Sequence, residues 1–212
     1  MKKTGIKGNT PPVFSSGFGR GQWDPRDWML VKSPRWDHFG GWIQEEDHIR
    51  NETPPGATES EMLGEKAGLT YSSMLCRRLW QAPVQVECEM SFDDRMAPLV
   101  VIAEPCGVDA KGRSEYRRHM EVVLYDKGLN VWQHVYEKGK PSWTKIGQSD
   151  FGFAPKQRYV LRVGILKHEL QITVDDHGLG CKHPGLPEAF QVGLTGCEGI
   201  NRFYRFNVKA GD

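Results

Sequence analysis

Short runs in which apolar and polar residues alternate dominate this chain. Between residues 84 and 92 every second side chain is apolar, whereas residues 99–103 are apolar throughout. Alternation is typical of a strand with one face in a core, and a continuous apolar run fits a strand covered on both faces. The 24 glycines and 13 prolines fall mostly between such runs, as turn residues do in all-β proteins. The pattern predicts an all-β sandwich and no helix.

The spacing of these runs predicts about a dozen strands. They lie near residues 28–32, 42–44, 48–51, 71–77, 83–92, 99–103, 114–136 (a hairpin), 143–148, 159–166, 169–175, 190–195 and 202–209. We predict a long loop at residues 51–68, and long loops in compact domains often have a function. We expect residues 1–22 to form an irregular N-terminal arm and residues 23–212 to form a single β-sandwich domain.

The predicted hairpin of residues 114–136 has one apolar face and one face rich in reactive groups. Met120, Val122 and Leu124 point to one side of its first arm, and their neighbours point to the other. We take Lys127 and Gly128 as a two-residue turn. The cross-strand pairs on the reactive face are then Val123 with Trp132, Glu121 with His134, and His119 with Tyr136. Paired side chains lie roughly 4.5–5.5 Å apart, so these groups should share one patch.

Composition narrows the class of protein. The chain is 38% hydrophobic and 26% charged, as in ordinary globular proteins. A net charge of +1 without a basic stripe predicts no nucleic-acid partner. No segment reaches the roughly 20 apolar residues of a membrane helix, so we expect no membrane partner. The N-terminus lacks the apolar core of a signal peptide. We therefore expect a cytoplasmic protein, or a secreted or periplasmic one if an export signal has been removed.

Four segments of the second half have a familiar order. They read VQVECEMSF (84–92), PLVVIA (98–103), RYVLRVGILKHELQITVDDHG (158–178) and FQVGLTGCEGINRFYRFNVK (190–209). This succession resembles the concanavalin A-like lectin/glucanase superfamily, which includes laminin G domains and legume lectins. The resemblance covers roughly residues 80–209. It implies a jelly-roll β-sandwich of two antiparallel sheets that binds sugar on the concave sheet. The ExDxxE strand of the family 16 glucanases is absent, so their mechanism is not implied.

Two kinds of carbohydrate chemistry fit the polar strand faces. A glycoside hydrolase needs two carboxyl groups, about 5–5.5 Å apart for retention or 6.5–9.5 Å for inversion. Glu87 and Glu89 share one strand face, and Glu121 would join them from a neighbouring strand. If these two glutamates only face solvent, they carry no function.

A polysaccharide lyase needs a base, an acid and a cation that neutralises a uronate carboxylate. His119 or His134 would be the base and Tyr136 the acid. Arg117 or Arg113 would bind the carboxylate. Alternatively, one histidine bonds Glu121 and only braces the sheet.

We predict a carbohydrate-active protein that takes an oligosaccharide or polysaccharide. The predicted catalytic residues are His119, Glu121, His134 and Tyr136. The predicted substrate-binding residues are Trp132, Asn130, Arg117, Glu87 and Glu89. Trp132 would stack on a sugar ring, and Trp36 and Trp42 would form a groove wall. The alternative function is a lectin-like carbohydrate-binding module without catalysis.

Metals and disulfides play a smaller part in the prediction. The segment HGLGCKH (177–183) lacks a fourth zinc ligand at a known spacing, so we predict no metal site there. Asp93–Asp94 and Asp175–Asp176 are the places where a structural calcium ion would bind. The five cysteines form no close pair and are odd in number, which predicts reduced thiols.

Overall fold

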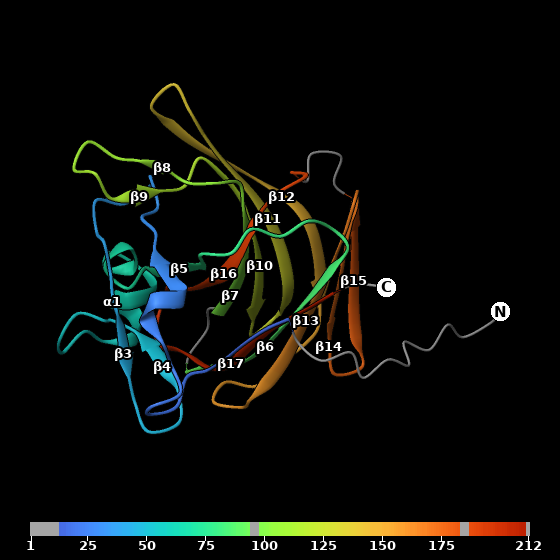
Figure 1. The fold of residues 1–212 in the computed structure, drawn as a ribbon. Helices are drawn as coiled ribbons and strands as arrows, with labels where there is room; N and C mark the ends of the chain where they lie inside the picture. The colour runs from blue at the N-terminus through green and yellow to red at the C-terminus, as the bar shows by residue number, and fades with distance from the viewer. Residues whose placement is uncertain (1–12, 94–97, 183–186, 211–212) are drawn as a thin grey trace.

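The alternating runs of the sequence become the strands of two antiparallel sheets (Figure 1). The computed structural model describes residues 13–93, 98–182 and 187–210. In pairing order, the first sheet contains β15 (His177–Lys182), β14 (Glu169–Val174), β13 (Tyr159–Leu166), β6 (Val84–Phe92), β17 (Asn201–Ala210), β4 (Ile49–Asn51) and β3 (Trp42–Gln44), with β1 (Phe14–Gly17) paired to β17. The predicted β-sandwich of antiparallel strands is confirmed.

The second sheet carries the hairpin. In pairing order, it contains β12 (Lys140–Asp150), β11 (Gly128–Glu137), β10 (Arg118–Tyr125), β7 (Pro98–Ala103), β16 (Gln191–Gly196), β5 (Ser72–Cys76) and β2 (Trp28–Leu30). A small ribbon of β8 (Gly107–Val108) and β9 (Ser114–Glu115) lies at the same end of the molecule as the β11–β12 turn (Figure 1).

Two expectations about local structure were wrong. Part of the expected irregular arm forms β1, because residues 14–17 pair with the long strand β17. The long loop contains a short helix, α1 (Glu59–Leu63), where Thr58 and Glu61 form a capping box whose T-x-x-E spacing is visible in the sequence. The 3-10 turns η1 (Pro25–Asp27) and η2 (Ala67–Leu69) complete the helical elements of the described residues. None of these helices is long and apolar enough to cross a membrane.

The core lies between the sheets and uses one face of each strand. Val86 and Leu161 from the first sheet, and Val122 and Val131 from the second, are completely buried in one apolar cluster. Burying such a side chain contributes about 1.5–3 kcal/mol relative to leaving it exposed. All five cysteines are unpaired. The alternation therefore determines which side chains point away from the core.

The pairing of the two hairpin strands is shifted by two residues from the predicted register. Tyr125 pairs with Gly128, so Asp126 and Lys127 form the turn. Gly128 is required for another reason: its φ is 143°, and a Cβ there would lie 2.0 Å from the carbonyl oxygen of Ser149 on β12. The actual cross-strand pairs are Val123 with Asn130, Glu121 with Trp132, and His119 with His134. A shift of two residues keeps every side chain on its predicted face, since side chains alternate with period two.

The face of the second sheet that points away from the core is also partly covered. Val31, Leu75, Val101, Ala103 and Tyr116 form a small apolar cluster there. The chain that follows β2 crosses this face and bridges to β9, because the Lys32 N–H donates to Ser114 and the Tyr116 N–H donates to Lys32. A segment from the first quarter of the chain thus forms a wall over strands that follow it later in the sequence.

Asn51 ties the long loop to the end of the second sheet. Its side chain is fully buried, and its Nδ2 donates to the carbonyl oxygens of Thr70 and Gly199 at 2.8 and 2.9 Å. Its Oδ1 accepts the Asn201 N–H at 2.8 Å. This single amide therefore fixes the loop after η2 against the β16–β17 connection.

We expect Gly193→Ala to destabilise the fold. Gly193 lies on β16 between β5 and β7, where a Cβ would sit 2.0 Å from the Met74 carbonyl oxygen. Relieving that overlap requires backbone movement in the middle of the sheet, which typically costs about 1–3 kcal/mol. Chemical denaturation measures the change. Gly180→Ala on β15 is the control, because its Cβ would meet nothing closer than 3.9 Å. Equal stability of the two variants would contradict the explanation.

Candidate functional site

A groove of about 280 Å³ lies on the outward face of the second sheet. We call it the sheet groove. Its floor comes from β7, β10 and β11 and consists of Leu99, Glu121, Val123, Tyr125, Asn130, Trp132 and His134. Its walls come from four other parts of the chain and consist of Arg35, Trp36, Ala67, Tyr71, Trp143, Cys197 and Glu198. The predicted reactive face of the hairpin therefore opens into a concave site.

Three predicted residues meet at the groove floor, where Glu121 and His134 line the groove and His119 lies beside them. The Glu121 carboxylate lies between two imidazoles, with Oε1 at 3.3 Å from His119 Nε2 and Oε2 at 2.9 Å from His134 Nε2. All three side chains are at least nine-tenths buried. The His119 contact is a hydrogen bond, whereas the His134 contact is close but poorly aligned for one. We call these residues the His–Glu–His cluster.

A stack of rings holds the cluster in place. The His134 ring lies over the His119 ring at 4.7 Å, and the His119 ring lies over Tyr116 at 4.1 Å. The Tyr116 hydroxyl is 2.6 Å from Ser73 Oγ, which is also 2.6 Å from Thr195 Oγ1. Because β5 and β16 supply these hydroxyls, four strands of the second sheet fix the position of the two imidazoles.

The cluster is electrostatically unusual. Burial alone would raise the pKa of Glu121, but the electrostatic interaction with His134 and the hydrogen bond from His119 outweigh it and hold that pKa far below its ordinary value. Burial lowers the pKa of His119, against the opposing effect of Glu121. At neutral pH the structure therefore keeps Glu121 as a carboxylate and His119 as a neutral imidazole, which can accept a proton.

The cluster also has the residue types of a metal site, but its geometry does not suit one. The three donor atoms lie within 4.8 Å of one another. A metal ion binds along the lone pair of each imidazole and therefore lies close to the plane of each ring. The two rings are stacked with only 13° between their planes, so their lone pairs do not converge on one point. As arranged, the histidines suit proton transfer better than metal binding.

Trp132 and Asn130, two of the predicted substrate-binding residues, lie on the groove floor. Trp132 is partly exposed and packs beside Leu99 and Val123. The Lys145 ammonium lies 5.3 Å from the centre of its ring. The indole therefore offers a flat apolar surface with a cation beside it.

Tyr136 and Arg117 lie outside the sheet groove, contrary to the expectation of one shared patch. They line a neighbouring hollow of about 430 Å³ beside β8 and β9. The Arg117 guanidinium lies over the Tyr136 ring at 5.5 Å and is held by Glu115 and by the Val108 carbonyl oxygen. Arg113 is bound to Asp109 at 2.7 Å. Neither arginine is free to bind a substrate carboxylate in the groove.

Glu87 and Glu89 were assigned to the wrong sheet. They lie on the outward face of β6 in the first sheet, on the other side of the core. Glu87 contacts Arg162 at 3.0 Å, and Glu89 contacts Arg205 at 3.6 Å. Strand alternation gives the face of a strand but not the sheet to which it belongs, so these glutamates looked equivalent to Glu121 in the sequence.

The segments considered for metals also have other partners. Asp93 pairs with Arg202, and Asp175 occupies the β14–β15 turn with a φ of 49°. His177 stacks on Phe151 at 4.0 Å, and Cys181 donates to the Ile146 carbonyl oxygen. Asp94 and His183 lie outside the described residues. Of the described residues, only the His–Glu–His cluster brings three such donor side chains together.

Several wall residues were missed or only partly anticipated. Trp36 lines the groove, as suggested, whereas Trp42 packs against Phe203 at 5.5 Å. Arg35, Tyr71, Trp143 and Glu198 also line the groove. Arg35 and Tyr71 lie in or beside irregular segments, where no hydrophobic periodicity indicates the direction of a side chain. Burial raises the pKa of the Tyr71 hydroxyl well above its ordinary value, so this group stays protonated.

The comparisons with known proteins concern the fold. No protein-family model and no curated protein matches this sequence. The carbohydrate-binding module CBM66 from Bacillus subtilis is similar over 87% of this chain and 96% of its own, with 14% identity and a TM-score of 0.59. The κ-carrageenase from Pseudoalteromonas carrageenovora, solved with an oligotetrasaccharide of κ-carrageenan, covers 99% of both chains with 10% identity and a TM-score of 0.58. A galectin-like protein of unknown function from Bacillus subtilis covers 93% of this chain and 95% of its own, with 8% identity and a TM-score of 0.63.

These similarities define the fold as a concanavalin A-like jelly roll, as the sequence resemblance implied. At such low identities they leave the chemistry to this chain's own residues.

We expect acid to destabilise the protein in two steps. Below pH 6.5, the ordinary pKa of histidine, the unfolded chain takes up a proton at position 119 that the folded chain, with its lowered pKa, does not. Below pH 4.5, the ordinary pKa of glutamate, the unfolded chain takes up a proton at position 121 that the folded chain does not. The stability that each group contributes is fully present above the ordinary pKa of that group and is lost as the pH falls below it. His119→Gln should remove the first step, which costs at most about 1.4 kcal/mol per pH unit.

Thermal unfolding measured from pH 7.5 to 4 tests this expectation. His168→Gln, on the exposed turn between β13 and β14, is the control substitution. An unchanged loss of stability between pH 6.5 and 5 in His119→Gln would show that another group causes it.

Proposed function

We propose that this protein binds a glycan in the sheet groove and cleaves it by acid–base catalysis. The observation that carries the proposal is the His–Glu–His cluster buried at the groove floor. Buried charge is costly unless it is paired, and such clusters are frequent where proton transfer takes place. A fold that other proteins use to bind and degrade carbohydrate adds support.

Each member of the cluster has a defined part in the proposal. Glu121 stays ionised and orients the imidazoles, as a carboxylate does in other histidine-dependent sites. Of the two imidazoles, His134 is the one that lines the groove and is placed to contact the substrate, while its Nε2 faces the Glu121 carboxylate. His119 lies behind it in the stack and fixes its ring. In this scheme His134 is the catalytic base, and Glu121 and His119 are positioning residues.

The contacts of Glu121 favour imidazole chemistry over hydrolysis by two carboxyl groups. Each of its oxygens already faces a histidine nitrogen. A retaining glycosidase needs a carboxylate whose oxygen attacks the sugar, and an inverting one needs a carboxylate that activates water. Glu87 and Glu89 are in the other sheet and do not supply a second carboxyl group.

Aromatic side chains suit the groove for a sugar ring. Trp132 forms part of the floor, while Trp36 and Trp143 form part of the walls. Indole faces pack against the C–H side of a pyranose and exclude water there, and the Asn130 amide beside Trp132 can bond sugar hydroxyls.

The alternative is a lectin-like module that holds the same glycan without cleaving it. The similarity to CBM66, which spans nearly the whole of that carbohydrate-binding module, favours it. In this case the His–Glu–His cluster would only brace the hairpin.

Incubation with a panel of neutral and acidic oligosaccharides tests the proposal. We expect cleavage of at least one member, seen as new reducing ends or as absorbance of an unsaturated product. His134→Ala should lower the rate by roughly 100-fold or more, the usual contribution of a general acid or base. Glu121→Gln should also lower it, because the amide no longer supplies the charge that orients the histidines.

His168→Ala, far from the groove, is the matched control and should keep full activity. Thermal melting of each variant separates loss of chemistry from loss of folding. Binding without cleavage would favour the lectin-like alternative, and full activity of both cluster variants would refute the assignment.

A further inference from the structure

Arg35 is the cation of the groove wall. It follows β2 on the segment that crosses the second sheet, and its backbone N–H donates to Ser33 Oγ. Its guanidinium lies 5.0 Å from the centre of the Trp36 ring and 4.6 Å from that of Trp143. Both tryptophans line the groove with it. Stacking on two indoles holds the charge in a fixed place while leaving its N–H donors in the ring plane free.

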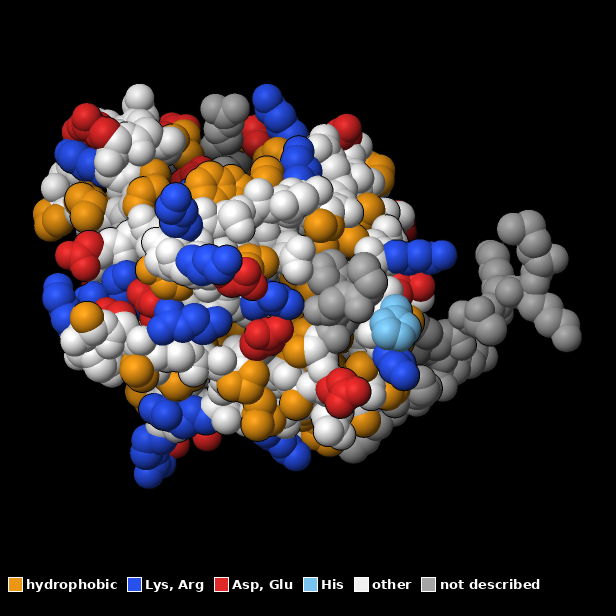
Figure 2. Space-filling view, turned by 90° about the horizontal axis from the view of Figure 1, so that it is seen from above, with side chains coloured by type: hydrophobic (Ala, Val, Ile, Leu, Met, Phe, Trp, Pro, Cys, Tyr) orange, Lys and Arg blue, Asp and Glu red, His pale blue; other side chains and the backbone are white. Residues whose placement is uncertain are grey.

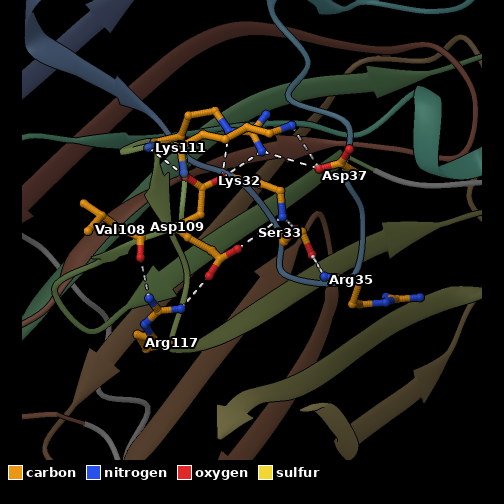
Figure 3. A network of polar contacts seen from close by, with 10 residues as sticks. Lys32, Ser33, Arg35, Asp37, Val108, Asp109, Lys111 and Arg117 are labelled. Carbon is orange, nitrogen blue, oxygen red and sulfur yellow. Dashed lines mark hydrogen bonds and ion pairs between the residues drawn. The ribbon is translucent and has the colours of Figure 1, made fainter. Parts of the chain in front are cut away.

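The neighbouring cations contrast with Arg35, because each already has an acidic partner (Figure 3). Lys32 and Glu115 form a buried ion pair at 3.1 Å, and Arg117 joins the same carboxylate. Lys111 lies 3.8 Å from Asp37. Figure 3 shows the Arg35 side chain directed away from this network, with a dashed line only at its backbone. Among the described residues, its guanidinium has no hydrogen bond or ion pair.

The acidic groups around the groove have their own partners. Glu121 is flanked by His119 and His134, and Glu198 also has an interaction partner. Lys145 adds a second cation beside Trp132. Figure 2, which views the molecule from above, shows Lys and Arg side chains spread over this face with acidic side chains between them. The groove therefore presents an unpaired arginine toward the place where a sugar would lie.

We propose that Arg35 binds the carboxylate of an acidic sugar, so that the ligand of the groove is a uronate-containing glycan. This inference rests on the proposed function and names its substrate class. A guanidinium matches a carboxylate with two parallel N–H donors, which is the strongest geometry available to it. The two tryptophans place that fork beside the floor that holds His134.

A uronate also defines the reaction. The carboxylate acidifies the adjacent C5–H, and neutralising it with Arg35 lowers the cost of removing that proton. His134 takes the proton, the C5–H electron pair forms the C4=C5 double bond, and the bond from C4 to the glycosidic oxygen breaks. The leaving oxygen takes the proton of the Tyr71 hydroxyl, which lines the same groove. No other reactant is consumed in this β-elimination.

Binding to matched acidic and neutral sugars tests the inference. The probes are oligosaccharides of galacturonate, glucuronate, mannuronate and guluronate, each beside its carboxyl-reduced counterpart of the same linkage. Calorimetry with the full chain should show one acidic probe binding at least 10-fold more tightly than its reduced form. Arg35→Met should lose roughly 10- to 100-fold of that affinity, the usual effect of removing a charge-assisted pair. Arg35→Lys should retain part of it, because the charge remains without the fork.

Arg78→Met is the matched control, since Arg78 also stacks on a tryptophan, Trp80, at 4.7 Å but lies outside the groove. It should leave the preference for acidic sugar unchanged. Thermal melting of Arg35→Met checks that the fold is intact, and Arg35→Lys provides the comparison if it is not.

Equal affinity for acidic and reduced probes, or an unchanged preference in Arg35→Met, would overturn the inference. If only neutral glycans are bound or cleaved, the role of Arg35 is refuted while the proposed function stands. If no glycan of either set is bound, both are refuted.

Discussion

The site depends on one constraint: the negative charge of a carboxylate that is buried away from water must be balanced by groups close to it. Glu121 meets this requirement through two imidazoles on the same face of the hairpin. An unpaired buried charge would cost several kcal/mol, whereas a paired and oriented one fixes the protonation states of its partners. The stacked rings of Tyr116, His119 and His134 and the hydroxyls of Ser73 and Thr195 keep that balance in a single geometry.

The walls of the groove rely on similar buried polar contacts. The Lys32–Glu115 pair secures the segment that carries Arg35 and Trp36, and the Asn51 amide secures the loop after η2 against the β16–β17 connection. Both contacts join parts of the chain that lie far apart in sequence. The floor is therefore built by strand pairing, and the walls that carry Arg35, Trp36 and Tyr71 are held by long-range contacts that cover one face of the sheet.

The hairpin shows how much the sequence alone could predict. Its turn was placed one residue too late, and the register was wrong by two residues. The set of side chains on the reactive face was still correct, because strand alternation repeats every two residues. The resemblance of residues 80–209 predicted the jelly roll, and the structural similarities confirm it. By contrast, the capping box at Thr58 was overlooked, although its spacing is visible in the sequence.

The amino-acid pattern by itself determined the all-β class, the inward and outward faces of the strands, and the presence of His119, Glu121, Trp132 and His134 on one face. Only the tertiary structure decided which faces share a groove. It separated Glu87 and Glu89 from Glu121 by the thickness of the core, engaged Arg117 with Glu115, and brought Arg35 beside Trp143. The physical reason is that alternation is a local property of the backbone, whereas the choice of sheet and the path of a covering loop follow from contacts between distant segments.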